Sequence, residues 1–217
     1  DNDIIENEII ENNQVELNIN SVNQLEKVKK IHTEAEKFNP KIEETFKYLQ
    51  IFSAICDSFS HGANDVANAI GPFAAIYMIH RSDGDITKKM DMGKDAYWIL
   101  AIGGVGIALG LMVYSKKIIN AIGSKLCKIT PSRGTCIEFG SALVIITGSR
   151  LKIPLSTTHC QVGATVGVGL LENKSCNNLK NLNINGVNWY ILVKTAFGWV
   201  ITCVIVGTTS GLLVAQG

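Results

Sequence analysis

Polar and ionisable side chains recur at helical spacing within one otherwise apolar stretch of the sequence. Four of them are separated by four, three and four residues and would share one face of a helix: Asp57, His61, Asn64 and Asn68. Asp65 lies beside that face. Such a stripe would line a hydrophilic path through a helical bundle. The alternative is that these groups hydrogen bond to other helices and hold the bundle together, and His61 alone could cap a broken helix.

Three hydroxyl residues, Ser156, Thr157 and Thr158, follow Pro154 in a later apolar stretch. Proline is favoured in the first turn of a helix, so the three hydroxyls are expected in that turn. Free N–H groups at a helix N-terminus attract anions, and the hydroxyls add further donors. The alternative is that the hydroxyls bond back to carbonyls of their own helix.

Glu138 is the single charge in the apolar stretch from Gly134 to Ser149, with Ser141 and Ile145 on the same helical face. A carboxylate in hydrocarbon must find a partner or be protonated. We expect a coupling or gating role for Glu138. The alternative is a salt bridge, to Arg133 or to another part of the protein.

The balance of charge suggests how an anion and a cation would share a site. Away from the ends of the apolar stretches, Lys194 is the only Lys or Arg. An anion would therefore be bound by dipoles, hydroxyls or a co-bound cation, since Asp57 and Asp65 would repel it. A hard cation held by carboxylate and carbonyl oxygens removes that repulsion, and its binding would complete the anion site.

Long apolar windows must position these residues. Ala96–Tyr114 and Ile153–Leu171 lack Asp, Glu, Lys and Arg, and Trp189–Ala215 contains only Lys194. A membrane-spanning helix needs about 20 mostly apolar residues. The sequence therefore predicts an all-α, polytopic membrane protein rather than a soluble protein with buried helices. Five segments are expected: Phe46–His80, Ala96–Tyr114, Gly134–Ser149, Ile153–Leu171 and Trp189–Val214.

Two parts of this pattern should be irregular. The first is too long for one simple span and contains Gly62, Gly71 and Pro72, which predict a broken helix. The third and fourth are separated only by residues 150–152, which predicts a tight hairpin or two half-length pieces that meet inside the protein. Small residues also recur at helix-packing spacing, at Gly106 and Gly110, Gly163 and Gly167, and Gly207 and Gly211.

Residues 1–45 are polar, and their composition predicts a linker or tail. Apolar residues recur at helical spacing from Asn23 to Lys47, with Pro40 interrupting the pattern. This stretch is either an amphipathic helix on the membrane surface or a transient helix in a cytoplasmic linker. The chain has no initiator Met and stops at Gly217 after an apolar run, so we expect a piece of a longer protein.

Loop charges indicate an orientation. The loop over 115–133 carries five Lys and Arg residues without an acid, which places it in the cytoplasm, whereas the loop over 81–95 balances its charges and fits the opposite side.

No basic patch with interleaved aromatics occurs, so nucleic acid is not an expected partner. The six Cys residues show no disulfide or zinc spacing and are expected as reduced thiols.

Three motifs resemble those of the inorganic phosphate transporter (PiT) family. The run from Gly62 to Pro72, GANDVANAIGP, looks like the signature of that family. The run from Pro154 to Cys160, PLSTTHC, with the Val162–Gly163 that follows, is similar to its second signature, although Leu155 stands where Ile is frequent. The segment 133–138, RGTCIE, resembles one that carries a functional Glu. The resemblance covers about residues 46 to 217.

The resemblance implies one half of an inverted-repeat transporter: the second, C-terminal repeat over residues 46–217, preceded by the end of a cytoplasmic loop. It implies symport of phosphate with sodium or protons, most simply sodium, across the plasma membrane by alternating access. The positions implied for phosphate are Asn64, Asn68, Ser156, Thr157 and Thr158. Asp65 with Asn64 would bind sodium. Asp57 and Glu138 would couple the movement of the cation to that of phosphate, or gate the transport path.

No cofactor is expected besides the co-transported sodium ion, and the expected partners are phosphate, sodium, the lipid bilayer and the N-terminal repeat, with a homo-oligomer left open. Alternatives are a proton-coupled phosphate or sulfate carrier, a membrane-embedded hydrolase using Ser156 or Asp65 with His159, and a structural or receptor-like module. The hydrolase lacks an oxyanion loop, and the receptor would leave the intramembrane acids unexplained. Because the polar stripe should face the other repeat, we expect instability in isolation.

Overall fold

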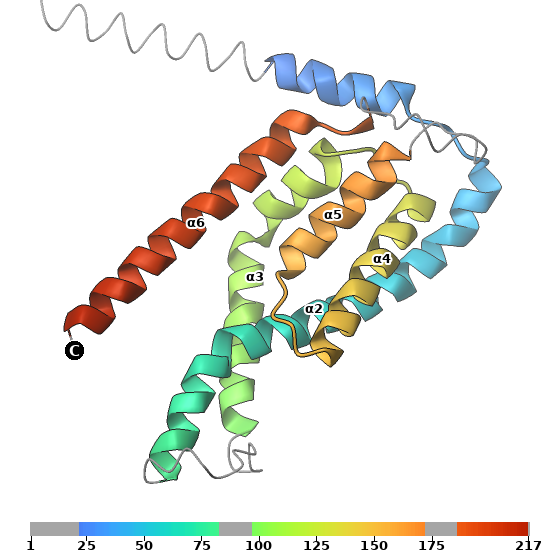
Figure 1. The fold of residues 1–217 in the computed structure, drawn as a ribbon. Helices are drawn as coiled ribbons and strands as arrows, with labels where there is room; N and C mark the ends of the chain where they lie inside the picture. The colour runs from blue at the N-terminus through green and yellow to red at the C-terminus, as the bar shows by residue number, and fades with distance from the viewer. Residues whose placement is uncertain (1–21, 83–96, 172–185, 217) are drawn as a thin grey trace, which may run out of the picture. The chain divides into compact units, whose positions relative to one another are not determined.

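The computed structural model describes residues 22–82, 97–171 and 186–216, and within these ranges every regular element is a helix. A helix over residues 22–34 is followed by five longer ones: α2 (Pro40–Arg81), α3 (Tyr97–Lys125), α4 (Pro131–Arg150), α5 (Thr157–Leu170) and α6 (Trp189–Gln216) (Figure 1). The predicted all-α class is confirmed. The loop over 83–96, residues 1–21 of the polar leader and Cys176 lie outside the described residues.

Two compact units share the chain. One comprises residues 37–122 and 129–168 and contains α2, most of α3, α4 and nearly all of α5. The other comprises residues 1–36, 123–128 and 169–217 and contains α6. All residues expected to bind ligands belong to the first unit, which is therefore the one that positions the site.

Helix α2 begins at Pro40, inside the stretch predicted as one amphipathic helix. The Asn39 side chain accepts a hydrogen bond from the Lys41 N–H at 3.0 Å, and Pro40 occupies the first turn, where its missing N–H costs nothing. The preceding helix ends at residue 34. Pro40 thus starts a helix instead of interrupting one, because its fixed backbone angle suits a helix start.

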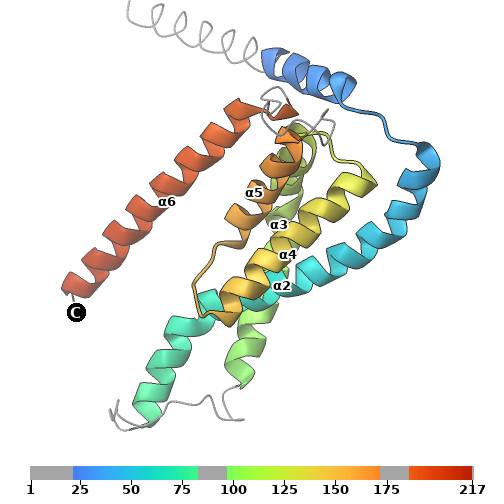
Figure 2. The ribbon, with the colours of Figure 1, turned by 45° about the vertical axis from the view of Figure 1, so that its right-hand side comes forward.

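The predicted break in the first apolar segment is wrong, because α2 runs without interruption through Gly62, Gly71 and Pro72 for 42 residues. It changes direction along its length in both views of the ribbon (Figures 1 and 2). Pro72 cannot donate to the carbonyl four residues earlier, that of Asn68, and proline is the usual cause of such bends. The Asn68 carbonyl therefore loses its helical partner next to the predicted site.

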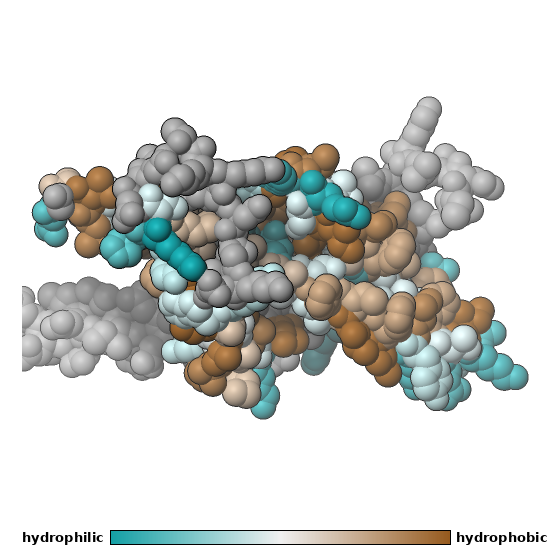
Figure 3. Space-filling model, turned by 90° about the horizontal axis from the view of Figure 1, so that it is seen from below, coloured by the Kyte–Doolittle hydropathy of each residue, from teal (hydrophilic) through white to brown (hydrophobic). Residues whose placement is uncertain are grey.

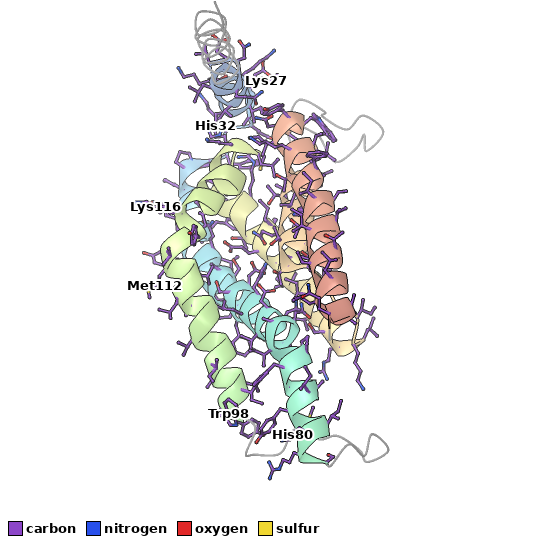
Figure 4. The ribbon with its side chains drawn as sticks, turned by 90° about the vertical axis from the view of Figure 1, so that its left-hand side faces the viewer. Lys27, His32, His80, Trp98, Met112 and Lys116 are labelled. Carbon is purple, nitrogen blue, oxygen red and sulfur yellow. The ribbon has the colours of Figure 1, made fainter. Side chains whose placement is uncertain are left out.

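The C-terminal half of α2 packs on α3. Ala74 and Ile99 are buried between the two helices, and Trp98 contacts Phe73 and Tyr77 edge to face. A Cβ at Gly103 would lie only 2.3 Å from Ile70 Cγ1, so the missing side chain lets the helices approach closely. Trp98 and His80 lie at the same end of the pair, whereas Met112 and Lys116 project from the outer side of α3 (Figure 4).

Helix α4 packs against α2. Ser141 and Ile145, which share a helical face with Glu138, are at most 1% exposed. Thr130 does not cap α4 with its own side chain; instead Glu43 of α2 accepts a hydrogen bond from the Ser132 N–H at 3.1 Å. A carboxylate at this position satisfies a free N–H and complements the helix dipole. It also fixes α4 to the start of α2.

Helices α4 and α5 run side by side and are joined by residues 151–156 (Figures 1 and 2). The 14 residues of α5 are about 21 Å long, which is shorter than a hydrocarbon core of about 30 Å. Of the two arrangements predicted for this region, the pair fits the tight hairpin, because α4 has 20 residues and only α5 is a half-length piece.

Large apolar side chains are exposed on α2, α3, α4 and α6, and apolar patches are visible on the face shown in Figure 3. Two helices are long and apolar enough to cross a membrane: residues Tyr97–Lys116 of α3 and the whole of α6. No residue of α6 is buried. The paired glycines at 106 and 110, 163 and 167, and 207 and 211 have no atom within 4 Å of a built Cβ. The predicted small-residue contacts are therefore not made within the described chain.

Candidate functional site

The N-terminus of α5 lies against the middle of α2, where Thr157 meets Asp65. The Thr157 hydroxyl lies 3.0 and 3.1 Å from the two carboxylate oxygens of Asp65 and donates to them. Thr157 is only 5% exposed, whereas Asp65 is half-buried. The structure thus brings together two predicted site residues that are 92 positions apart. A carboxylate beside a hydroxyl oxygen is a ligand pair that suits a hard cation.

Two amides of α2, from Asn64 beside Asp65 and from Asn68 three residues after it, bind the loop that leads into α5. The Asn64 and Asn68 Nδ2 atoms both donate to the Leu155 carbonyl, at 3.0 and 3.1 Å. Ser149 Oγ donates to Asn64 Oδ1 at 3.4 Å. Each amide still has a second N–H, which is available to a ligand.

These amides border a pocket of about 340 Å³. Its walls come from α2, from the end of α4 and from the connecting loop: Ala63, Asn64, Ala67, Asn68, Ser149, Lys152, Ile153 and Pro154. Of the site residues predicted from the sequence, Asn64 and Asn68 line this pocket, whereas Asp57, Asp65, Glu138 and Ser156 to Thr158 do not. The polar side chains of its wall are two amides, which both donate and accept, the Ser149 hydroxyl and the ammonium of Lys152.

The first turn of α5 begins later than predicted. Pro154 lies outside the helix, and Ser156 is its N-cap, because the Ser156 carbonyl accepts from the Cys160 N–H at 3.2 Å. Ser156 Oγ also accepts from the His159 N–H at 3.4 Å. Capping uses a lone pair of Ser156 and leaves its O–H proton free to donate. Thr157 and Thr158 are then the first two helical residues, where backbone N–H groups have no helical partner.

Asp57 and Glu138 lie in a separate cluster, nearer the start of α2. His61 Nδ1 is 3.1 Å from Asp57 Oδ1, and Asp57 is 7% exposed. Glu138 of α4 accepts a short hydrogen bond from Ser53 of α2. The predicted stripe is thus divided into a ligand-sized pocket around Asn64 and a carboxylate cluster, which the Ser53 hydroxyl ties to α4.

Two residues of the pocket wall, Ser149 and Lys152, were missed by sequence reasoning, as was the Leu155 carbonyl that accepts from both amides. A backbone carbonyl has no sequence signal. Ser149 directly precedes the short break between two apolar segments and Lys152 ends it, and that break was the available signal.

Comparison with known proteins gives the family. Residues 5–210 match the model of the phosphate transporter family. Sodium-dependent phosphate transporter 1 of Xenopus tropicalis is 40% identical over 176 residues, which cover 81% of this chain and 24% of that protein. The human protein of the same name is 39% identical over the same shares. The phosphate-repressible phosphate permease pho-4 of Neurospora crassa is 38% identical over 188 residues, covering 86% of this chain and 30% of the relative.

A solved structure agrees with these relatives. The structure described as the sodium-dependent phosphate transporter matches 80% of this chain and 44% of its own, with a TM-score of 0.54 and 36% identity. The chain thus spans about a quarter of the length of the first two relatives and less than half of the solved chain. The family match extends over most of the sequence, and the chain belongs to the phosphate transporter family.

Proposed function

We propose that this chain is part of a multi-pass membrane transporter that carries inorganic phosphate together with sodium. The pocket between α2 and the loop before α5 supports this most directly, because hydrogen-bond donors for an anion lie next to a carboxylate–hydroxyl pair suited to a cation. The names of the relatives and the apolar surfaces of α3 and α6 support the same proposal.

Phosphate would enter the pocket and take the unused donors. The second amide protons of Asn64 and Asn68 belong to its wall. The Ser156 hydroxyl and the N–H groups of Thr157 and Thr158 follow in the chain after Pro154, which also lines the pocket. Backbone and side-chain dipoles can bind a phosphate without arginine, since helix N-termini favour anions. Thr157 differs from the other predicted phosphate ligands, because its hydroxyl proton is already donated to Asp65.

Sodium would bind on the Asp65 side of the pocket. Its ligands would be Asp65 carboxylate oxygen, the Thr157 hydroxyl oxygen and Asn64 Oδ1, and the Asn68 carbonyl released by Pro72 is a further oxygen nearby. With sodium bound, Asp65 no longer repels phosphate, and the α5 N-terminus is held on α2. Cation binding therefore prepares the anion site, and this accounts for coupling.

The remaining parts of the transporter would complete the path. We propose an inverted second copy of these motifs in the N-terminal repeat, with both halves rocking around a site near the bilayer midplane. Residues 1–45 would then lie in the cytoplasm and α6 in the lipid of the plasma membrane. Several exposed apolar faces of α2 fit contact with that other repeat.

Proton coupling is the second candidate, because the half-buried His61 contacts Asp57 on the same helix and the pair could carry a proton. The experiment that separates the two is uptake of radiolabelled phosphate into proteoliposomes containing the full-length transporter. We expect uptake with an inward sodium gradient and none when potassium replaces sodium. Uptake driven by a proton gradient and indifferent to sodium would support the second candidate, and no phosphate uptake under either gradient would contradict both.

Glu138 would gate or couple rather than bind phosphate, since Ser53 links it to α2 away from the pocket. We expect Glu138→Gln to lower the maximal rate of uptake about tenfold with little change in the phosphate KM, because Gln keeps an acceptor for Ser53 but loses the charge. Ser53→Ala, which keeps the charge, should have a smaller effect. Initial rates over a range of phosphate concentrations measure both quantities. A rise in KM at an unchanged maximal rate would place Glu138 in phosphate binding instead.

A further inference from the structure

The loop between α4 and α5 contains a lysine where helix ends favour glycine. Two hydrogen bonds close α4, from the Lys152 N–H to the Ser149 carbonyl at 3.2 Å and from the Ile153 N–H to the Gly148 carbonyl at 2.9 Å. This pair of bonds defines a Schellman motif and requires a left-handed residue between the helix and its last donor. Lys152 is that residue, with φ of 58°, and in the described ranges no other non-glycine residue has positive φ.

The contacts around the loop fix where this residue sits. Leu155 packs directly over Gly148, where a Cβ would lie only 2.1 Å from Leu155 Cδ1. The Leu155 carbonyl accepts hydrogen bonds from the Asn64 and Asn68 side-chain amides of α2. Lys152 is therefore anchored by the helix end on one side and by α2 on the other.

The position of Lys152 gives the pocket its only charged wall residue. It lines the pocket together with Asn64, Asn68 and Ser149, while the remaining wall residues are apolar. No ion pair or side-chain hydrogen bond of Lys152 is found among the described residues. A lysine carries its charge on a flexible stem and recognises phosphate as a point charge.

We propose that Lys152 is a phosphate-recognition residue, which draws the anion into the pocket and contacts it once bound. This inference rests on the proposed function of the same pocket and adds a cationic ligand to donors that are otherwise neutral. Among the residues that line the pocket, Lys152 alone carries a net charge, and a net charge attracts an anion over a longer distance than a neutral side-chain dipole does.

Backbone geometry offers a way to separate charge from loop shape. Lys152→Gly removes the ammonium and relaxes the left-handed position, whereas Lys152→Gln removes the charge and keeps the length and the strain. Lys152→Arg keeps the charge. Arg150→Gln is the matched control, because it removes an equal charge two residues away from a side chain that does not line the pocket.

The test measures phosphate binding and transport by the full-length transporter. We expect Lys152→Gln and Lys152→Gly to raise both the Kd for radiolabelled phosphate in detergent and the KM of uptake about three- to tenfold, as for loss of a partly screened charged hydrogen bond. Lys152→Arg and Arg150→Gln should match the wild type. The ratio of the KM of Lys152→Gln to the KM of the wild type should become smaller as choline chloride is added at fixed sodium, because salt screens the charge of Lys152.

Several outcomes would overturn the proposal. A Lys152→Gln variant with wild-type Kd and KM would do so, as would an equal effect of Arg150→Gln, which would indicate general surface charge. Lipid phosphate is the other source of the same chemistry, so uptake is compared in vesicles with and without an anionic lipid. An effect seen only with the anionic lipid would assign Lys152 to a headgroup. Wild-type protein that binds no phosphate would instead contradict the proposed function itself.

Discussion

Asp65→Asn will reduce sodium-driven phosphate uptake by the full-length transporter at least about 50-fold. At about 2.4 Å and an effective dielectric of about 20, a carboxylate and a sodium ion attract each other by about 7 kcal/mol. If a third of this survives the cost of removing both ions from water, about 2.3 kcal/mol is lost, which is a change of about 50-fold. Initial uptake rates over a range of sodium concentrations measure the effect.

The contact with Thr157 makes the result specific. Asn has nearly the same shape as Asp and can still accept the Thr157 hydroxyl through its amide oxygen. The link between α2 and α5 is therefore kept while the charge is removed. Thr157→Val makes the complementary change, because it keeps the charge of Asp65 and removes the hydroxyl. Its uptake should be reduced less than that of Asp65→Asn and should recover at high sodium.

Glu44→Gln is the control for the loss of one negative charge from the same helix. Glu44 is exposed in the first turns of α2, before the apolar segment begins. The Glu44→Gln variant should therefore transport phosphate at the wild-type rate. Equal amounts of each variant in the vesicles are checked by immunoblot. Normal sodium-coupled uptake by a well-inserted Asp65→Asn variant would remove Asp65 from the cation site.

Sequence patterns predicted the helices well and their ends poorly. The apolar window from Ala96 to Tyr114 located α3, but the helix continues to Lys125, because charges end a hydropathy window and lysine is a good helix former. The glycines and proline of α2 predicted a break. The structure keeps the helix and bends it, since packing on α4 and α3 can compensate for one missing hydrogen bond.

Proximity across the site was predictable only through the resemblance of the motifs. Asp65 and Thr157 were assigned to one site, and the structure places them in contact, but their separation of 92 residues gives no local signal for the contact. The acceptor for both α2 amides is a main-chain carbonyl, that of Leu155, which any residue would supply. Tertiary structure alone shows these contacts.

Glycine spacing was a misleading signal for the same reason. The regularly spaced pairs in α3, α5 and α6 contact nothing in the described chain, while the single Gly103 and Gly148 permit close approach. Whether a small residue mediates packing depends on which side of its helix meets another element. That side is set by the whole fold, including the other repeat that we propose.

Asn64→Asp is expected to raise the phosphate KM about 100-fold. The change keeps the shape of the side chain but replaces the amide donor with a carboxylate, 3.0 Å from the Leu155 carbonyl oxygen that it now faces. It also places a negative charge in the wall of the phosphate pocket. At about 5 Å and an effective dielectric of about 20, the repulsion of a single negative charge is about 3 kcal/mol, which corresponds to about 100-fold.

Asn39→Asp is the matched control, because the same chemical change there should cost nothing. Asn39 caps α2 by accepting from the Lys41 N–H, and Asp is an equally good cap that also complements the helix dipole. Loss of transport could still reflect a displaced loop, so Asn64→Ser, a small neutral variant, is measured beside it. A larger KM increase for Asn64→Asp than for Asn64→Ser shows that charge in the pocket is responsible. Equal increases would show that the hydrogen bond to Leu155, rather than phosphate contact, is the role of Asn64.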